Sequence, residues 1–118
     1  MKWFVLILSF SLSCLELSAQ GDYYERQARS HQNDAAYYVK QAQGYDRDVE
    51  YYMREAAGHL RDAEYYQRQK QYEQARISLR KARNAIEKAD DNKRKADNAR
   101  SNAKSYMRRA EDALQKAK

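Results

Sequence analysis

The chain has 118 residues and a net charge of +6, from 23 Lys and Arg against 17 Asp and Glu, with no proline and three glycines. This composition leaves little to interrupt a helix, and the period-two alternation of β-strands is absent. No Gly-rich phosphate loop, metal-ligand cluster or paired nucleophile and base is present, so we expect neither an enzyme nor a cofactor. The length fits one all-α domain.

Residues 1–19 have the features of a secretory signal peptide: a basic residue near the start, an apolar stretch and small residues at its end. Cleavage after Ala19 and cleavage after Gly21 both fit. Cys14, the single cysteine, precedes either site, so the mature chain is expected to have no disulfide. The apolar stretch is short for a bilayer span. We therefore expect a secreted, extracellular protein (periplasmic or on the cell surface if bacterial) with no transmembrane segment.

Residues 22–68 are predicted to form a long helix, because tyrosine pairs recur there every fourteen residues, which is two heptads. The pairs are Tyr23-Tyr24, Tyr37-Tyr38, Tyr51-Tyr52 and Tyr65-Tyr66. Small and aromatic residues also recur at alternating steps of three and four, which is the spacing of a coiled-coil seam. The predicted seam residues are Ala28, His31, Ala35, Tyr38, Ala42, Tyr45, Val49, Tyr52, Ala56, His59, Ala63 and Tyr66.

The first tyrosine of each pair alternates with a small residue seven positions further on. The resulting column reads Tyr23, Ser30, Tyr37, Gly44, Tyr51, Gly58 and Tyr65. Large side chains beside small ones indicate knobs that meet gaps on a neighbouring helix. On a secreted protein without cysteine, such tyrosines are also candidates for oxidation or cross-linking.

Residues 72–117 are predicted to form a second long helix, in which alanine recurs every seven residues from Ala75 to Ala117. We predict a seam made of these alanines and of the larger apolar residues four positions after them. Its members are Ala75, Leu79, Ala82, Ile86, Ala89, Ala96, Ala103, Met107, Ala110 and Leu114. Lys93 and Arg100 fall on the same row and make its centre polar.

The two segments are expected to form an antiparallel helical hairpin with a turn near residues 68–71. Their heptad phases differ by two residues, so a single straight partner could not follow both seams on an unbroken helix. One continuous helix, about 140 Å long at about 1.5 Å per residue, is the alternative. Residues 65–82 resemble the turn and second helix of a tetratricopeptide repeat, and this resemblance implies a local helix-turn-helix only.

Charge also divides the chain. Residues 22–69 hold seven basic and nine acidic residues, and residues 70–118 hold fifteen and seven. Opposite net charges favour one half lying beside the other. Because an alanine methyl contributes only about 0.8 kcal/mol on burial, two such helices need further partners. We expect a homo-oligomer or pairing with another coiled-coil protein.

The basic second half has an alternative interpretation as a binder of extracellular polyanions or microbial surfaces. Specific nucleic-acid binding is not expected of a secreted chain. His31 and His59 lie twenty-eight residues apart, too far to share a metal on one helix. The candidate polyanion-binding residues are Lys81, Arg83, Lys88, Lys93, Arg94, Lys95, Arg100, Lys104, Arg108 and Arg109.

The sequence therefore predicts a secreted coiled-coil protein that acts as a structural, scaffold or matrix component through helix–helix assembly. Cationic binding of polyanions is the second hypothesis. The two differ in their response to salt, because charge-driven binding weakens with ionic strength and apolar assembly changes little.

Overall fold

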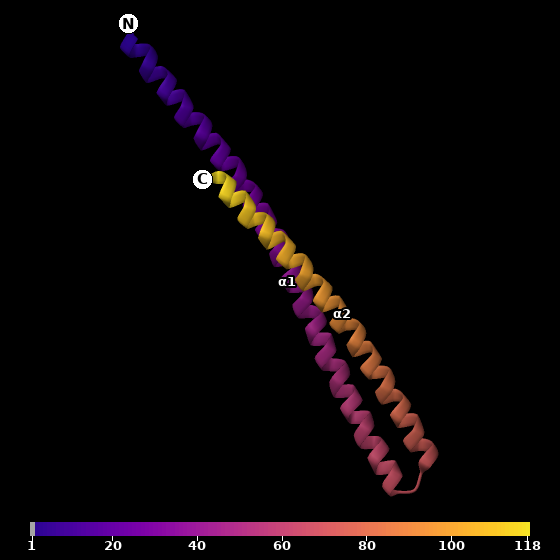
Figure 1. Cartoon of the computed structure of the whole chain (residues 1–118). Coiled ribbons are helices and arrows are strands. Elements are labelled where there is room, and N and C mark those ends of the chain that lie inside the picture. The colour runs from indigo at the N-terminus through magenta and orange to yellow at the C-terminus, as the bar shows by residue number, and fades with distance from the viewer. Residues whose placement is uncertain (1) are drawn as a thin grey trace. The chain divides into compact units, whose positions relative to one another are not determined.

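The computed structural model describes the backbone of residues 2–118 and the side chains of residues 19–118. The predicted signal peptide, except for Ala19, lies outside the residues whose side chains are described. The two helices are α1 (Lys2–Arg68) and α2 (Tyr72–Ala117), drawn in Figure 1. They contribute to two compact units, one made of Met1–Tyr37 with Asn102–Lys118 and the other of Tyr38–Ser101.

The second unit, Tyr38–Ser101, is a complete helical hairpin, because it contains the end of α1, the turn and the start of α2. The predicted all-α chain with an antiparallel helical hairpin is therefore confirmed. The turn also excludes the alternative of one continuous helix. In the other unit a stretch of α1 packs against the last part of α2, also antiparallel, with Ala28 beside Ala110 and Ala113 in one buried cluster.

The turn lies at residues 69–71, inside the predicted interval, and closes α1 with a Schellman motif. The Lys70 N–H donates to the Gln67 carbonyl at 3.0 Å, and the Gln71 N–H donates to the Tyr66 carbonyl at 2.8 Å. Lys70 has a φ of 59°, in the left-handed region where glycine is usual. The turn forms without a glycine because these two hydrogen bonds satisfy carbonyl groups at the end of α1.

The packed interior of both units is made of alanine. Every buried hydrophobic residue among residues 19–118 is an alanine, and Ser78 is the buried polar residue. The buried alanines are Ala28, Ala35, Ala42, Ala56, Ala63, Ala75, Ala82, Ala85, Ala89, Ala96, Ala99, Ala103, Ala110 and Ala113. Alanine lets two helices approach to about 8 Å, the short end of the usual range of interaxial distances. It also means that each buried side chain contributes little to stability.

On α1 every residue of the predicted row is buried or half-buried, and the other half-buried residues among residues 19–68 are Gly21, Tyr24, Gln41, Gly44, Asp46 and Gly58. Five alanines of that row, from Ala28 to Ala63, are buried. The remaining seven are half-buried: His31, Tyr38, Tyr45, Val49, Tyr52, His59 and Tyr66. A tyrosine at such a position packs its ring against α2 and extends its hydroxyl toward water.

On α2 the predicted alanines from Ala75 to Ala110 are buried and Ala117 is half-buried, but the second predicted row is wrong. Leu79, Ile86, Met107 and Leu114 are 44%, 38%, 52% and 41% exposed. The residues one position earlier face α1 instead. These are the buried Ser78, Ala85, Ala99 and Ala113 and the half-buried Asn92 and Tyr106.

The correction has a steric reason. After Ala75, both the step of three to Ser78 and the step of four to Leu79 are compatible with a coiled-coil row. Hydrophobicity alone favours Leu79 over Ser78. Helices already held close by alanine accept only another small side chain on the axis of contact, because a leucine there would force the backbones apart. The leucine is therefore displaced to the edge of the interface.

The left-handed conformation of Lys70 generates a stability prediction. Lys70→Gly should raise the free energy of unfolding by about 1 kcal/mol, because a side chain costs about 1–2 kcal/mol in this region. Urea unfolding followed by circular dichroism at a fixed protein concentration measures the change. Lys70→Ala is the matched control and should leave stability nearly unchanged. Equal effects of the two variants would contradict the assignment of the cost to backbone conformation.

Candidate assembly surface

In the hairpin unit, two half-buried tyrosines of α1 are covered by lysines of α2. The Lys88 Nζ lies 5.6 Å from the centre of the Tyr52 ring, and the Lys95 Nζ lies 6.0 Å from the centre of the Tyr45 ring. At these distances an ammonium group is attracted to the face of the ring. The lysines are seven residues apart, as are the tyrosines, so the same contact repeats along the antiparallel pair.

Arg100 provides an ion pair between the two helices of this unit. Its guanidinium donates to Asp46 Oδ2 at 2.8 Å and to Asp97 Oδ1 at 3.0 Å. The hydrogen bond to Asp46, followed by that to Asp97, raises the pKa of Arg100 above its ordinary value. Arg100 was expected in the centre of the seam, but it lies at the edge, where the charge remains in contact with water. An exposed pair of this kind fixes the register of the helices more than it adds stability.

The ten candidate polyanion-binding residues are all exposed, but they do not form one surface. In the hairpin unit, Lys81, Lys88 and Lys95 follow one side of α2, and Lys93 and Arg100 follow the opposite side. Arg83 and Arg94 point away from α1, and Arg94 pairs with Asp91 at 2.7 Å. In the other unit, Lys104 and Arg108 line a shallow hollow that also contains Glu111, and the Arg109 guanidinium lies 4.8 Å from the Tyr106 ring.

Sequence reasoning missed a more compact basic site near the turn. Arg76, Arg80 and Arg83 line a surface hollow of about 330 Å³ together with Leu79. Arg76 also pairs with Glu73 at 2.6 Å, and this hydrogen bond lowers the pKa of Glu73. The steps of four and three between the arginines place them on one helical face, and this spacing could have identified the site.

The large apolar residues of the hairpin unit gather on one edge, on the side where Asp46 meets Arg100. We call this edge the apolar flank and define it by Met53 and Leu60 of α1 and by Leu79 and Ile86 of α2. Met53 and Leu60 follow Asp46 in steps of seven, and Ile86 and Leu79 precede Arg100 by fourteen and twenty-one residues. Each side chain is between 38% and 48% exposed. None has a place in the alanine interior.

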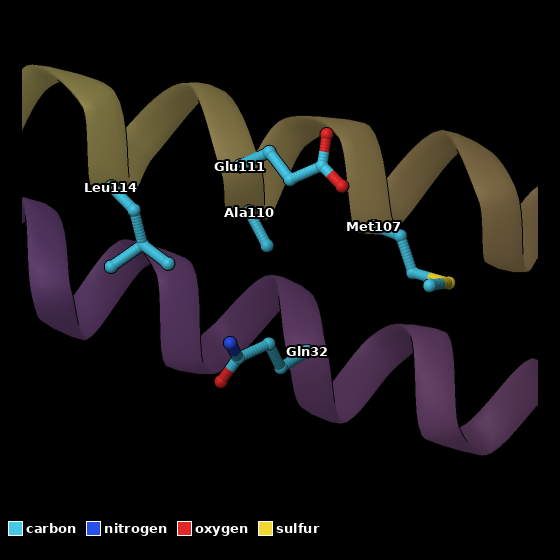
Figure 2. Close-up of a pocket in the computed structure, with 5 residues that line it drawn as sticks. All are labelled: Gln32, Met107, Ala110, Glu111 and Leu114. Carbon is cyan, nitrogen blue, oxygen red and sulfur yellow. The ribbon is translucent and has the colours of Figure 1, made fainter.

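The unit that contains the C-terminus has a smaller apolar groove, of about 180 Å³. Figure 2 shows Ala110 and Leu114 pointing from α2 toward α1, where Gln32 lies. Met107 and Glu111 of α2 also line the groove. Met107 and Leu114 belong to the same displaced row as Leu79 and Ile86. This row therefore carries exposed apolar side chains at both ends of α2, with Lys93 and Arg100 between them.

Away from the seam, α1 carries the exposed tyrosines of the fourteen-residue repeat. Tyr23, Tyr37, Tyr51 and Tyr65 are between 51% and 57% exposed. A methyl group added at Gly44 or Gly58 would meet nothing within 4 Å. The packing within the chain therefore does not explain glycine at these two positions, although glycine weakens a helix.

The Tyr51 hydroxyl is hydrogen-bonded to a carboxylate. It donates to Glu55 Oε1 at 2.8 Å, whereas the Tyr23 hydroxyl accepts a hydrogen bond from Gln27 Nε2 at 3.0 Å. The bond to the carboxylate, followed by the negative charge of Glu55, raises the pKa of Tyr51. The carboxylate is also placed to accept the phenolic proton if Tyr51 is oxidised.

His31 occupies a seam position in the unit that contains the C-terminus. Its ring centre lies 6.1 Å from that of Tyr106, and its Nδ1 is buried without a hydrogen-bond partner. Leaving a buried polar atom unpaired costs about 1–3 kcal/mol. Within residues 19–118, no three His, Cys, Asp or Glu side chains lie close enough together to hold a metal ion.

No helix in the described part of the chain has both the length and the apolar composition needed to cross a bilayer. No protein-family model matches the chain, and no curated protein or solved structure matches it either. The interpretation of its surfaces therefore rests on their own chemistry.

The open space beside the two helical glycines generates a second prediction. The double variant Gly44→Ala/Gly58→Ala should be more stable by about 1–2 kcal/mol, because alanine is favoured over glycine by about 1 kcal/mol inside a helix. Urea unfolding monitored by circular dichroism provides the measurement. Gln43→Ala, beside Gly44, is the control and should change stability by a few tenths of a kcal/mol at most. A less stable double variant would show that another chain fills this space.

The bond between Tyr51 and Glu55 generates a prediction about pH. Because the folded pKa of Tyr51 is raised above its ordinary value near 10, the bond stabilises the fold below that pH. This contribution is lost as the pH rises through the folded pKa. Glu55→Ala should lower the pKa of Tyr51, measured by NMR titration with ¹³Cζ-labelled tyrosine.

Two variants complete the titration. Tyr51→Phe identifies the Tyr51 signal by its loss. Glu50→Ala removes a neighbouring carboxylate that does not bond to Tyr51, so it should move the signal less. A Tyr51 pKa that does not change in Glu55→Ala would contradict the hydrogen bond.

Proposed function

We propose that this protein is a structural component, a scaffold or matrix protein that acts by assembling its helices with those of other chains. One observation carries the proposal: within residues 19–118, alanine fills the interior, while the larger apolar and aromatic side chains lie outside or at the edge of the interface. In an isolated helical pair, the reverse distribution would give more stability, because burial of a leucine contributes about two to three times as much as burial of an alanine methyl.

The chemistry of the surfaces supports assembly rather than catalysis. The apolar flank and the exposed tyrosines lie on different sides of α1, so one chain offers two kinds of contact surface. Tyrosine is suited to such contacts because its ring is apolar and its hydroxyl remains able to form hydrogen bonds. The partner is another copy of the chain or a different coiled-coil protein.

An extracellular location and tyrosine modification belong to the same proposal. The apolar leader supports secretion, and a chain without cysteine in its mature part has no disulfide with which to link its copies. Cross-linking of exposed tyrosines would supply a covalent link in an oxidising environment. Tyr51 is the best-placed candidate, because Glu55 can take up its proton when an external oxidant removes an electron.

Binding of extracellular polyanions is the second candidate function. The hollow lined by Arg76, Arg80 and Arg83 favours it, since three guanidinium groups near one another attract sulfate or carboxylate groups. The other cationic residues lie on several sides of α2, and Lys88 and Lys95 already contact tyrosine rings. We therefore place this function second.

Light scattering and sedimentation velocity at about 1 to 100 micromolar protein, which detect association with a dissociation constant in this range, test the proposal. The chain should be oligomeric, and a rise from about 0.05 to 0.5 M salt should leave its mass nearly unchanged. A helical monomer over the whole range would contradict the scaffold function. Retention of that monomer on a sulfated polymer, lost at high salt and in Arg80→Gln/Arg83→Gln, would establish the second candidate instead.

A further inference from the structure

We propose that the apolar flank of the hairpin unit pairs with the same flank of a second copy, about a two-fold axis parallel to the helices. The result is a four-helix bundle in which α1 of each chain faces α2 of the other. This inference rests on the proposed function and names the surface and the partner through which assembly begins.

The ion pair between Asp46 and Arg100 shows which residues of α1 and α2 lie at the same height along the helix axes, and we call each such height a level. Because the helices are antiparallel, one heptad toward the turn adds seven to the residue number on α1 and subtracts seven on α2. One step brings Met53 level with Lys93, and a second step brings Leu60 level with Ile86. The level of Leu60 and Ile86 is therefore apolar on both helices, the level of Met53 and Lys93 is mixed, and the level of Asp46 and Arg100 is charged on both.

This sequence of levels is self-complementary under the proposed symmetry. An axis parallel to the helices keeps every level opposite itself and exchanges α1 with α2. Leu60 of one copy then meets Ile86 of the other, and Asp46 of one copy meets Arg100 of the other. Two ion pairs become a ring of four alternating charges, while Leu60 and Ile86 of the two copies face each other.

The other charges at this edge also fit a second copy. Lys93 of one chain comes level with Met53 of its partner, where the lysine stem can cover the methionine while its ammonium group stays in water. An axis perpendicular to the helices would instead place α1 against α1 and α2 against α2, so that Asp46 of one copy could not face Arg100 of the other. Charge complementarity thus selects both the partner and the direction of pairing.

The opposite edge of the hairpin unit does not offer an equivalent surface. Lys88 and Lys95 lie there over tyrosine rings, and the acidic Asp48 and Glu55 belong to the same side of α1. That edge is polar and is already covered by contacts within the chain. On the apolar flank, by contrast, the large side chains remain between 38% and 48% exposed.

Cysteine cross-linking of the full-length chain tests the geometry, with Cys14→Ser as the background. Chains with Leu60→Cys and chains with Ile86→Cys should form disulfide-linked dimers when mixed, at least tenfold faster than either variant alone. The reason is that α1 faces α2, whereas the two copies of α1 lie on the diagonal of the bundle. The measurement is the rate of dimer formation on non-reducing gels.

The cross-linking experiment also has a matched control. A mixture of Asp48→Cys and Asn98→Cys chains, whose residues are exposed and lie level with each other away from the flank, should cross-link no faster than either of these variants alone. Equal rates for Leu60→Cys alone and for its mixture with Ile86→Cys would overturn the proposed symmetry. Absence of cross-linking in that mixture would overturn the proposed flank.

A charged variant separates failure of this inference from failure of the proposed function. Leu60→Glu/Ile86→Glu should raise the concentration for half-association at least tenfold by light scattering. Asn84→Glu/Asn98→Glu adds the same two charges at exposed positions of α2 away from the flank and should leave that concentration within about twofold. Because Leu60 and Ile86 are exposed in the hairpin, loss of helix in the first variant alone would also support the flank. Undiminished assembly of the first variant overturns this inference only, and a monomeric unmodified chain overturns both.

Discussion

Close packing of alanine against alanine sets the distance between α1 and α2, and the other features of the chain adapt to this distance. A side chain larger than alanine is tolerated only where it can leave the axis of contact. Tyr45 and Tyr52 do so by turning their rings toward the edge, where Lys95 and Lys88 cover them. The same steric limit moves Leu79 off the interface, so steric fit, and not hydrophobicity, decides which residues are buried.

The charge difference between the two halves of the sequence becomes specific contacts in the hairpin unit. Asp46 and Arg100 join the helices at one edge, and lysine–tyrosine contacts join them at the other. Exposed ion pairs contribute little to stability, but each is lost if one helix slides by a heptad. An alanine seam alone would permit such slippage because its residues are alike, so these edge contacts supply the register that the interior lacks.

The fold was predictable from the sequence, whereas half of the α2 interface was not. The period of the apolar residues identifies the two helices, and the difference in heptad phase between them indicates a turn. The row of seam residues on α1 follows from the tyrosine repeat. On α2, steps of three and of four from each alanine are equally regular, and hydrophobicity favoured the wrong one. Alanines at 85, 99 and 113, spaced by fourteen like the tyrosine pairs, were the signal for the correct row. The cation–π contacts were not predictable, because they depend on the register of one helix against the other.

The exposed apolar side chains of the apolar flank are difficult to explain by solubility or helix formation alone. If Leu60, Leu79 and Ile86 served only solubility or helix formation, lysine, glutamate or glutamine would serve as well, since all favour helices and prefer water. Exposed apolar side chains add a risk of aggregation that polar ones avoid. These side chains are regularly spaced on one edge, beside one acidic and one basic residue. Association through this edge is therefore favourable only with a partner whose apolar and charged residues follow a matching order. A surface of this kind is explained by a function in assembly, because assembly gains both affinity and direction from it.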